Sequence, residues 1–317
     1  MTPTIRPLSK KRARASFAWW RSPVLREEAI TGLLFVLPAV LGLLLFIYLN
    51  YRGIQLSFTN WTWISRKPPE FVGFNNYAAI LKPDSDFIKA LGRTVIYVLF
   101  VPVSVSVSFL IALLANQAMK GQSFFRVVAY IPAVTGAGVL VVVWIYLFSL
   151  DGPVNWLLRG IGITQPPRWN TLTEWKQVAI LILLAWSAAP GMIVALAGLQ
   201  AIPRDFYDAA KVDGASSWTT LTKLTIPLMS PTLFFQLVLG VIAAWQTFDI
   251  IYFWAQPGTG NQDVNLWTVS VRIYQYAFSE NRPGLGVASA IVLGCVILIF
   301  TSLNFIAQRR WVNYDIT

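Results

Sequence analysis

The polar side chains best placed to act together lie in residues 207–231, YDAAKVDGASSWTTLTKLTIPLMSP, between two long apolar runs. Asp208 and Asp213 supply carboxylates, which can pair with a basic surface or accept bonds from backbone N–H groups. Ala209 and Ala210 have small side chains that would let another surface approach closely. The pattern indicates a docking element, and the alternative is an amphipathic loop that only packs against its own bundle.

The rest of the chain has few residues suited to catalysis or to metal binding. The sequence has no histidine, which is the commonest metal ligand and general acid or base, and its one cysteine, Cys295, lies in an apolar run. Paired carboxylates are absent from the apolar runs, and no Gly-rich phosphate-binding pattern is present. We therefore expect no enzyme activity and no cofactor or metal bound by this chain.

The backbone that must position the docking residues can be predicted from turn chemistry. Pro203 is suited to begin a short helix that runs to Asp213, and Gly214 suits the left-handed position that ends such a helix. Ser216 or Ser217 can cap a second short helix. Pro227 and Pro231 then bracket the start of the next long apolar segment. The expected result is a helix–turn–helix that is too short to cross a membrane.

Long apolar segments surround this element. Only 12% of the residues are charged, against roughly a quarter in soluble domains. Six stretches of at least 23 residues contain no charge, and a spanning helix needs about 20 apolar residues. The fold class is thus predicted to be an all-α polytopic membrane protein with six transmembrane helices. The expected spans lie near 29–50, 94–116, 127–149, 177–200, 230–252 and 284–307.

The charge distribution predicts the orientation. With the N-terminus inside, the inner segments hold 14 of the 25 Lys and Arg although they are shorter in total than the outer ones. The net charge of +11 then reflects the cytoplasmic flanks and the lipid surface, and no nucleic-acid partner is expected. The predicted organisation is a cytoplasmic tail (1–28), a six-helix membrane domain (29–310) with the polar loop (201–231) between its fourth and fifth helices, and a cytoplasmic tail (311–317).

The fourth predicted span contains a proline and a glycine side by side in its interior. Pro190 lacks a backbone donor and Gly191 follows it, so we expect a kink within AWSAAPGMIVAL. In lipid, the backbone groups freed by the kink must be satisfied by neighbouring helices or line a cavity.

The segment AIPRDFYDAAKVDGASSWTTLTKLTIPLMSP resembles the EAA loop of permease subunits of binding-protein-dependent ABC importers. The matching positions are Asp208, Ala209, Ala210, Asp213, Gly214, Ala215, Pro227, Leu228 and Pro231, with Asp208 in place of the usual Glu. LSFTNW (56–61), FVGFNNY (71–77), FFRVVAYIP (124–132) and TFDIIYFWAQPGTG (247–260) are similar to the carbohydrate importers of the maltose and glycerol-3-phosphate type.

This resemblance implies a mechanism and partners. The loop would be the coupling element that sits in a groove of a cytoplasmic ATPase. Two ATPase subunits would use ATP and Mg²⁺, a second, related permease would complete the path, and an extracytoplasmic binding protein would deliver a sugar or a related polyol or oligosaccharide. The location implied is the cytoplasmic (inner) membrane of a prokaryote, with both termini cytoplasmic.

The solute path is predicted less directly. Sugars are commonly held by aromatic faces and a few polar groups, and such side chains occur within or beside the spans. The candidates are Trp144, Trp186, Ser187, Trp245, Gln246 and Asp249, each of which also has a plain interpretation as packing or interface anchoring. An ion-coupled secondary transporter remains the alternative, although such proteins usually need intramembrane ionisable groups and Asp249 is the only acid within a predicted span.

Overall fold

The computed structural model describes residues 23–64, 68–116, 122–255 and 263–313. The chain forms two compact units, Met1–Gln55 and Leu56–Thr317. Within the described residues, the first unit is most of helix α1 (Pro23–Ser57), which is apolar over nearly its whole length. Most of the predicted cytoplasmic tail 1–28, and residues 314–317 of the second tail, lie outside the described residues.

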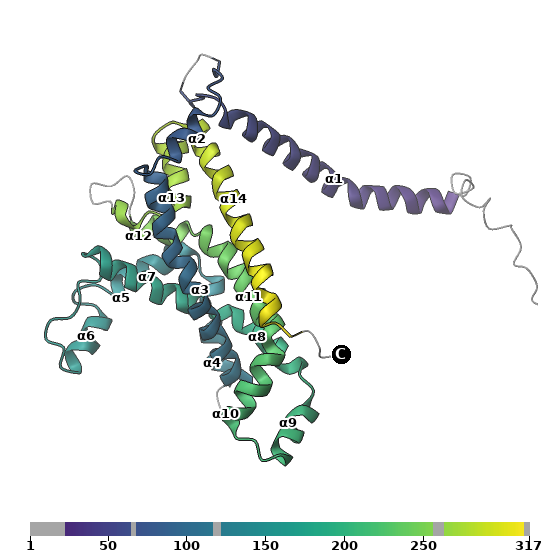
Figure 1. Ribbon diagram of the computed structural model, residues 1–317, viewed down its shortest axis with the longest axis vertical. Coiled ribbons are helices and arrows are strands. Elements are labelled where there is room, and N and C mark those ends of the chain that lie inside the picture. The colour runs from purple at the N-terminus through teal and green to yellow at the C-terminus, as the bar shows by residue number, and fades with distance from the viewer. Residues whose placement is uncertain (1–22, 65–67, 117–121, 256–262, 314–317) are drawn as a thin grey trace, which may run out of the picture. The chain divides into compact units, whose positions relative to one another are not determined.

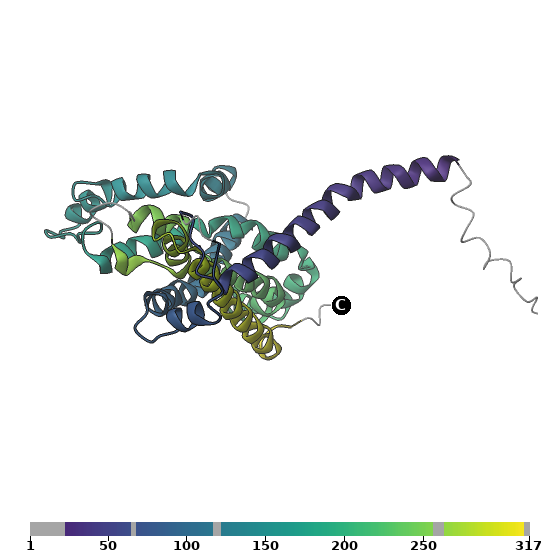
Figure 2. The same ribbon diagram turned by 90° about the horizontal axis from the view of Figure 1, so that it is seen from above.

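The second unit is helical throughout its described residues, apart from its connecting loops and an isolated bridge between Thr59 and Phe71. Figures 1 and 2 show this unit from two directions. Its α-helices are α2 (Asn75–Ile80), α3 (Asp86–Asn116), α4 (Gln122–Val134), α5 (Ala137–Leu147), α6 (Pro153–Gly160), α7 (Thr173–Ser187), α8 (Met192–Ala201), α9 (Arg204–Val212), α10 (Ser217–Thr220), α11 (Ile226–Trp245), α12 (Asp249–Ala255), α13 (Val269–Tyr274) and α14 (Pro283–Ala307). Two π-helical segments, Leu221–Thr225 and Gln275–Ser279, follow α10 and α13 directly.

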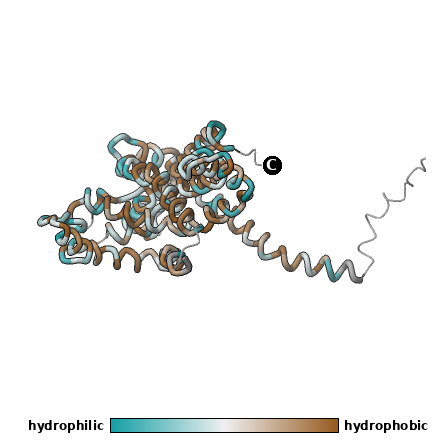
Figure 3. Tube along the Cα trace, turned by 90° about the horizontal axis from the view of Figure 1, so that it is seen from below, coloured by the Kyte–Doolittle hydropathy of each residue, from teal (hydrophilic) through white to brown (hydrophobic). Residues whose placement is uncertain are grey.

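Five helical segments of the described chain are long and apolar enough to cross a membrane: Glu27–Ser57, Asp86–Asn116, Thr173–Ala201, Ser217–Ala255 and Pro283–Arg310. Each contains one of the predicted spans. Hydrophobic residues predominate along these helices, whereas hydrophilic residues are more frequent in the connecting segments (Figure 3). Large apolar side chains such as Leu99 and Leu298 are exposed on the helices, which suits contact with lipid.

The remaining predicted span, 127–149, is not a single straight helix. The chain bends by 117° between Arg126–Val134 and Ala137–Leu147, so the two helices form either one broken span or a re-entrant loop. Gly136 has extended backbone angles and precedes α5, and the hydroxyl of Thr135 donates to the carbonyl of Ile131 at 2.9 Å. The Thr135 hydroxyl thus satisfies a carbonyl in the final turn of α4, where carbonyls have no backbone N–H partner within the helix. The count of six spans therefore stays a prediction.

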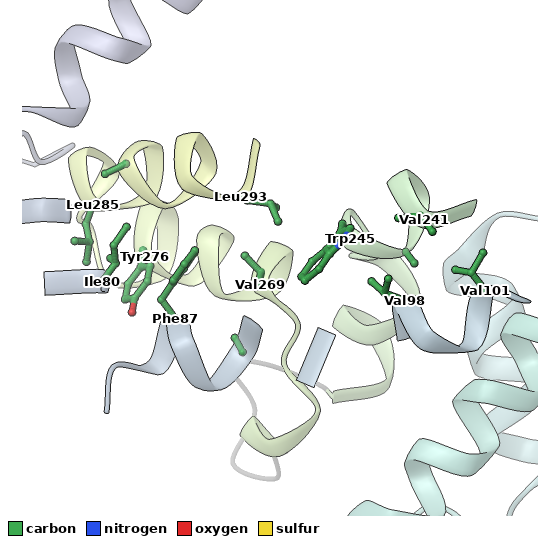
Figure 4. Packing of buried hydrophobic residues seen from close by; sticks show 13 residues of the cluster. Ile80, Phe87, Val98, Val101, Val241, Trp245, Val269, Tyr276, Leu285 and Leu293 are labelled. Atoms are coloured by element: carbon green, nitrogen blue, oxygen red, sulfur yellow. The ribbon is translucent and has the colours of Figure 1, made fainter. Parts of the chain in front are cut away.

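One hydrophobic cluster of the second unit is assembled mainly from α3, α11, α13 and α14. Trp245, at the end of α11, is fully buried and belongs to a cluster with Phe87, Val98 and Val269. Figure 4 shows its indole among side chains contributed by these helices. Helix α3 also packs against α8 and α7. As a result, α3, α8 and α11 come together around the break between α7 and α8.

Candidate functional site

The predicted docking element folds as a helix–turn–helix between α8 and α11. Helix α9 ends at Val212, and Gly214 has a φ of +70°, as expected for a left-handed helix terminator. The Gly214 N–H donates to the Lys211 carbonyl at 3.0 Å, and the Ala215 N–H donates to the Ala210 carbonyl at 2.9 Å. These two bonds make a Schellman motif, which satisfies carbonyls that the helix end would leave unpaired.

The second short helix begins at a serine cap and does not stop before α11. The Ser216 hydroxyl accepts a bond from the Thr219 N–H at 3.2 Å, so Ser216 is the cap. The helix then continues through the π-helical segment 221–225 into α11, with Pro227 in the first turn of α11 and Pro231 one turn later. Ser230 donates its hydroxyl to the Pro227 carbonyl at 2.7 Å. This carbonyl would otherwise lack a partner, because Pro231 has no N–H.

The helix–turn–helix exposes most of its surface. None of the residues of α9 is buried, and the apolar side chains Val212 and Trp218 are 88% and 72% exposed. Tyr207 is the half-buried contact of α9 with the cluster around Met229. Helix α9 is thus anchored at Tyr207 and leaves the rest of its surface open to a partner.

The charged residues of this element do not form a buried network. Asp208 pairs with Lys211, one helical turn away, at 3.0 Å, and their side chains are 66% and 76% exposed. An ion pair so open to solvent contributes little to stability. Asp208 can therefore exchange Lys211 for a basic group on another surface. Asp213, Ala209 and Ala215 are also exposed or half-buried on the same element.

The kink predicted at Pro190 is a full break between α7 and α8. Residues Ala189–Gly191 form a 3₁₀ turn, which leaves carbonyls without α-helical partners. The Ser108 hydroxyl of α3 donates to the Ala188 carbonyl, and the Gln236 amide of α11 donates to the Gly191 carbonyl at 3.2 Å. Both neighbouring helices therefore hydrogen-bond to the backbone at the break, and the Ala188 carbonyl also accepts from the Gly191 N–H at 2.9 Å.

A cavity of about 320 Å³ lies at this break, between α3, α7, α8 and α11. Its walls are largely apolar, with a few polar groups contributed by α3, by α11 and by Thr247 after α11. The polar lining residues are Tyr97, Ser104, Ser108, Gln236 and Thr247. A mostly apolar cavity with a small set of convergent polar groups is the usual form of a small-molecule site.

The residues suggested from sequence for the solute path do not line this cavity. Trp144 and Trp186 lie together, with ring centroids 5.7 Å apart, in an aromatic cluster around Phe148. The Ser187 hydroxyl is buried without a hydrogen-bond partner among the described residues, and Trp245 is in the core. Gln246 and Asp249 are exposed on either side of Thr247 and Phe248.

Sequence reasoning missed Ser104, Ser108 and Gln236 as cavity residues. A signal for the serines was present, because VPVSVSVS places Ser104 and Ser108 four residues apart in a charge-free run. Residues at this spacing share one face of a helix, and hydroxyls on a spanning helix call for a polar partner or a cavity. Gln236 carried no comparable local signal.

Known proteins resemble this chain over most of its length. The family model for the "Binding-protein-dependent transport system inner membrane component" matches residues 105–313. The probable ABC transporter permease protein YesP of Bacillus subtilis is 30% identical, over 93% of this chain and 96% of that protein. The lactose transport system permease protein LacF of Rhizobium radiobacter is 32% identical, over 92% and 98%.

A solved structure shares the fold. A chain of a bacterial ABC transporter involved in the import of alginate superposes with a TM-score of 0.77 at 24% identity, covering 93% of this chain and 99% of its own. The family match, which spans the break and the helix–turn–helix, and the two relatives over most of the chain establish what kind of protein this is. The chain belongs to the family of inner membrane components of binding-protein-dependent transport systems and is an ABC transporter permease.

Proposed function

We propose that this permease forms half of the translocation path of an ATP-driven saccharide importer. The observation that carries the proposal is the pairing of a cavity at a broken span with an exposed helix–turn–helix that follows the same span after two residues. The name of the LacF relative supports a saccharide as the solute. A second, related permease, two ATPase subunits and an extracytoplasmic binding protein complete the proposed assembly.

The helix–turn–helix is proposed as the ATPase-docking element. Val212 and Trp218 supply exposed apolar contact area, and Asp208 supplies a carboxylate that is paired with an exposed lysine. The element is continuous with α11, which contributes Gln236 and Gly240 to the cavity wall. A displacement of the element by a closing ATPase dimer would therefore be transmitted along α11 to the cavity. ATP and Mg²⁺ are proposed to act in the ATPase subunits and not in this chain.

Reconstitution tests this function. The complete complex is purified, placed in proteoliposomes, and supplied with ATP, its binding protein and one of four probes: glucose, lactose, maltose or maltopentaose. We expect at least one probe to be taken up with stimulated ATP hydrolysis, and no ATP hydrolysis by this subunit purified alone. Hydrolysis by the isolated subunit, or uptake that continues without ATP, would contradict the proposal.

The orientation is a separate prediction. The helix–turn–helix must be cytoplasmic to meet an ATPase, so α2 must lie outside. In a Cys295→Ser background, which removes the exposed native thiol, Asn75→Cys should react with an impermeant maleimide in whole cells or spheroplasts. Lys211→Cys should react only after the membrane is opened, although both positions are exposed on the subunit. The reverse labelling pattern would place the docking element outside and rule out its coupling role.

A further inference from the structure

A row of aromatic rings runs along the second unit and leads away from the residues that line the cavity. Its members belong to segments that are far apart in the sequence: the loop after α1, the π-helical segment after α13, α13 itself and the start of α12. In order, the rings are Trp61, Trp63, Phe278, Tyr274, Tyr252 and Phe248. We call these six residues the aromatic row.

Neighbouring rings in the row are in contact. The centroids of Trp61 and Trp63 are 4.6 Å apart, and Trp63 stacks on Phe278 at 5.9 Å with an interplanar angle of 14°. The next steps are 5.0 Å from Phe278 to Tyr274, 5.2 Å from Tyr274 to Tyr252, and 4.9 Å from Tyr252 to Phe248. All six residues are half-buried or exposed, so the rings keep accessible surface.

The outer part of the row is held in place by hydrogen bonds between distant segments. The Trp63 indole N–H donates to the Ala277 carbonyl at 2.6 Å, and the Trp63 backbone N–H donates to the Asn281 side chain at 2.8 Å. Asn281 itself has a φ of +54°, a conformation that Asn adopts more readily than most residues. Although Trp63 is 53% exposed, its orientation is fixed before any partner binds.

One end of the row is adjacent in the chain to a residue of the cavity wall. Phe248 directly follows Thr247, which lines the cavity, and the exposed residues Gln246 and Asp249 flank this pair. Aromatic faces next to a few polar side chains are what a sugar requires, because a pyranose ring has apolar C–H faces and a rim of hydroxyls. The negative face of an aromatic ring attracts those C–H groups, and the polar groups take the hydroxyls.

We propose that the aromatic row is a stacking path for the successive rings of an oligosaccharide on its way to the cavity. The proposal rests on the proposed function and specifies its solute as a saccharide of more than one ring. A single sugar ring would cover only a small part of a six-ring row.

The test compares row variants in the reconstituted complex with maltose and maltopentaose, alongside glucose and lactose. Tyr274→Leu and Phe278→Leu should each lower the uptake of the longest transported probe by roughly two- to tenfold, the equivalent of one aromatic contact. The loss should be smaller for the shorter probe, and Phe278→Tyr should restore uptake because it restores the ring. Trp156→Leu is the matched control, since Trp156 is 69% exposed on α6 and lies outside the row.

The outcomes separate the two proposals. If no probe is taken up by the unaltered complex, both the saccharide function and the stacking path are wrong. If probes are taken up but the row variants match Trp156→Leu, the function stands and the stacking path is overturned. Loss of copurifying second permease in Tyr274→Leu or Phe278→Leu, without a dependence on probe length, would show that the row is a subunit contact and would also overturn the stacking path.

Discussion

Gly214→Val is expected to reduce saccharide-stimulated ATP hydrolysis by at least tenfold while the subunit still inserts and pairs with its sister permease. The left-handed backbone at Gly214 costs other residues about 1–2 kcal/mol, and a β-branched side chain is a particularly poor fit there. A Cβ at this position would meet open space, so the damage comes from the backbone and not from a clash. The turn would reopen, and the Schellman bonds that set α9 against α10 would be lost.

The matched control for this change is Gly214→Asn. Asparagine enters the left-handed region more easily than other non-glycine residues, and the site has open space for its side chain. Pull-down of the ATPase subunit and hydrolysis in proteoliposomes should therefore be near normal for Gly214→Asn and low for Gly214→Val. Equal behaviour of the two variants would mean that the geometry of this turn does not matter for coupling.

Asp208→Ala is expected to act at the same surface by a different route. Removal of the Asp208 carboxylate breaks only a solvent-exposed ion pair with Lys211, so the free subunit should be as stable as before. If the carboxylate is desolvated against a basic group of the ATPase, however, truncation typically costs about 2–5 kcal/mol of docking energy. Unchanged ATPase binding by both Asp208→Ala and Gly214→Val would make the element a packed connector, with no docking role.

Ala243→Trp should lower solute uptake by at least tenfold through obstruction of the cavity. Ala243 lines the cavity wall, whose volume of about 320 Å³ is at the lower end of the range for small-molecule sites. An indole placed there would occupy space that a sugar ring needs. The variant should still copurify with the second permease and the ATPase, because Ala243 is exposed and its replacement displaces no core side chain.

Two controls accompany Ala243→Trp. Ala243→Ser leaves the cavity open and should transport normally. Ala290→Trp places the same indole at an exposed position of α14 that is outside the cavity lining, and it should also transport normally. Normal uptake by Ala243→Trp would mean that the solute does not pass through this cavity.

The features that could be predicted from sequence are those that depend on residues close together in the chain. Gly214, Ser216 and the short helices follow from local turn and cap chemistry, which needs no distant partner. The break at Pro190 is likewise local, because a missing N–H and an adjacent glycine weaken the same turn. Length and absence of charge also sufficed to place five spanning segments, since the bilayer sets both requirements.

The sharp bend in the predicted third span was not anticipated, because both arms are apolar enough to read as one continuous span. Gly136 begins a new helix there, and Gly138 lies against the Phe253 ring of α12, which is distant in the sequence. Trp245 was similarly suggested for the solute path and is a core residue. Hydrophobicity along a chain cannot separate an aromatic ring that faces a path from one that faces a neighbouring helix.

The sequence by itself determined the family, the apolar spans and the position of the helix–turn–helix, because each is encoded in a contiguous run of residues. Only the tertiary structure decided which residues line the cavity and which rings form the aromatic row. Ser108 and Gln236 are far apart in the chain and meet at the broken span only because α3 and α11 pack together. Such convergence depends on how helices pack, and packing is set by all of their contacts at once.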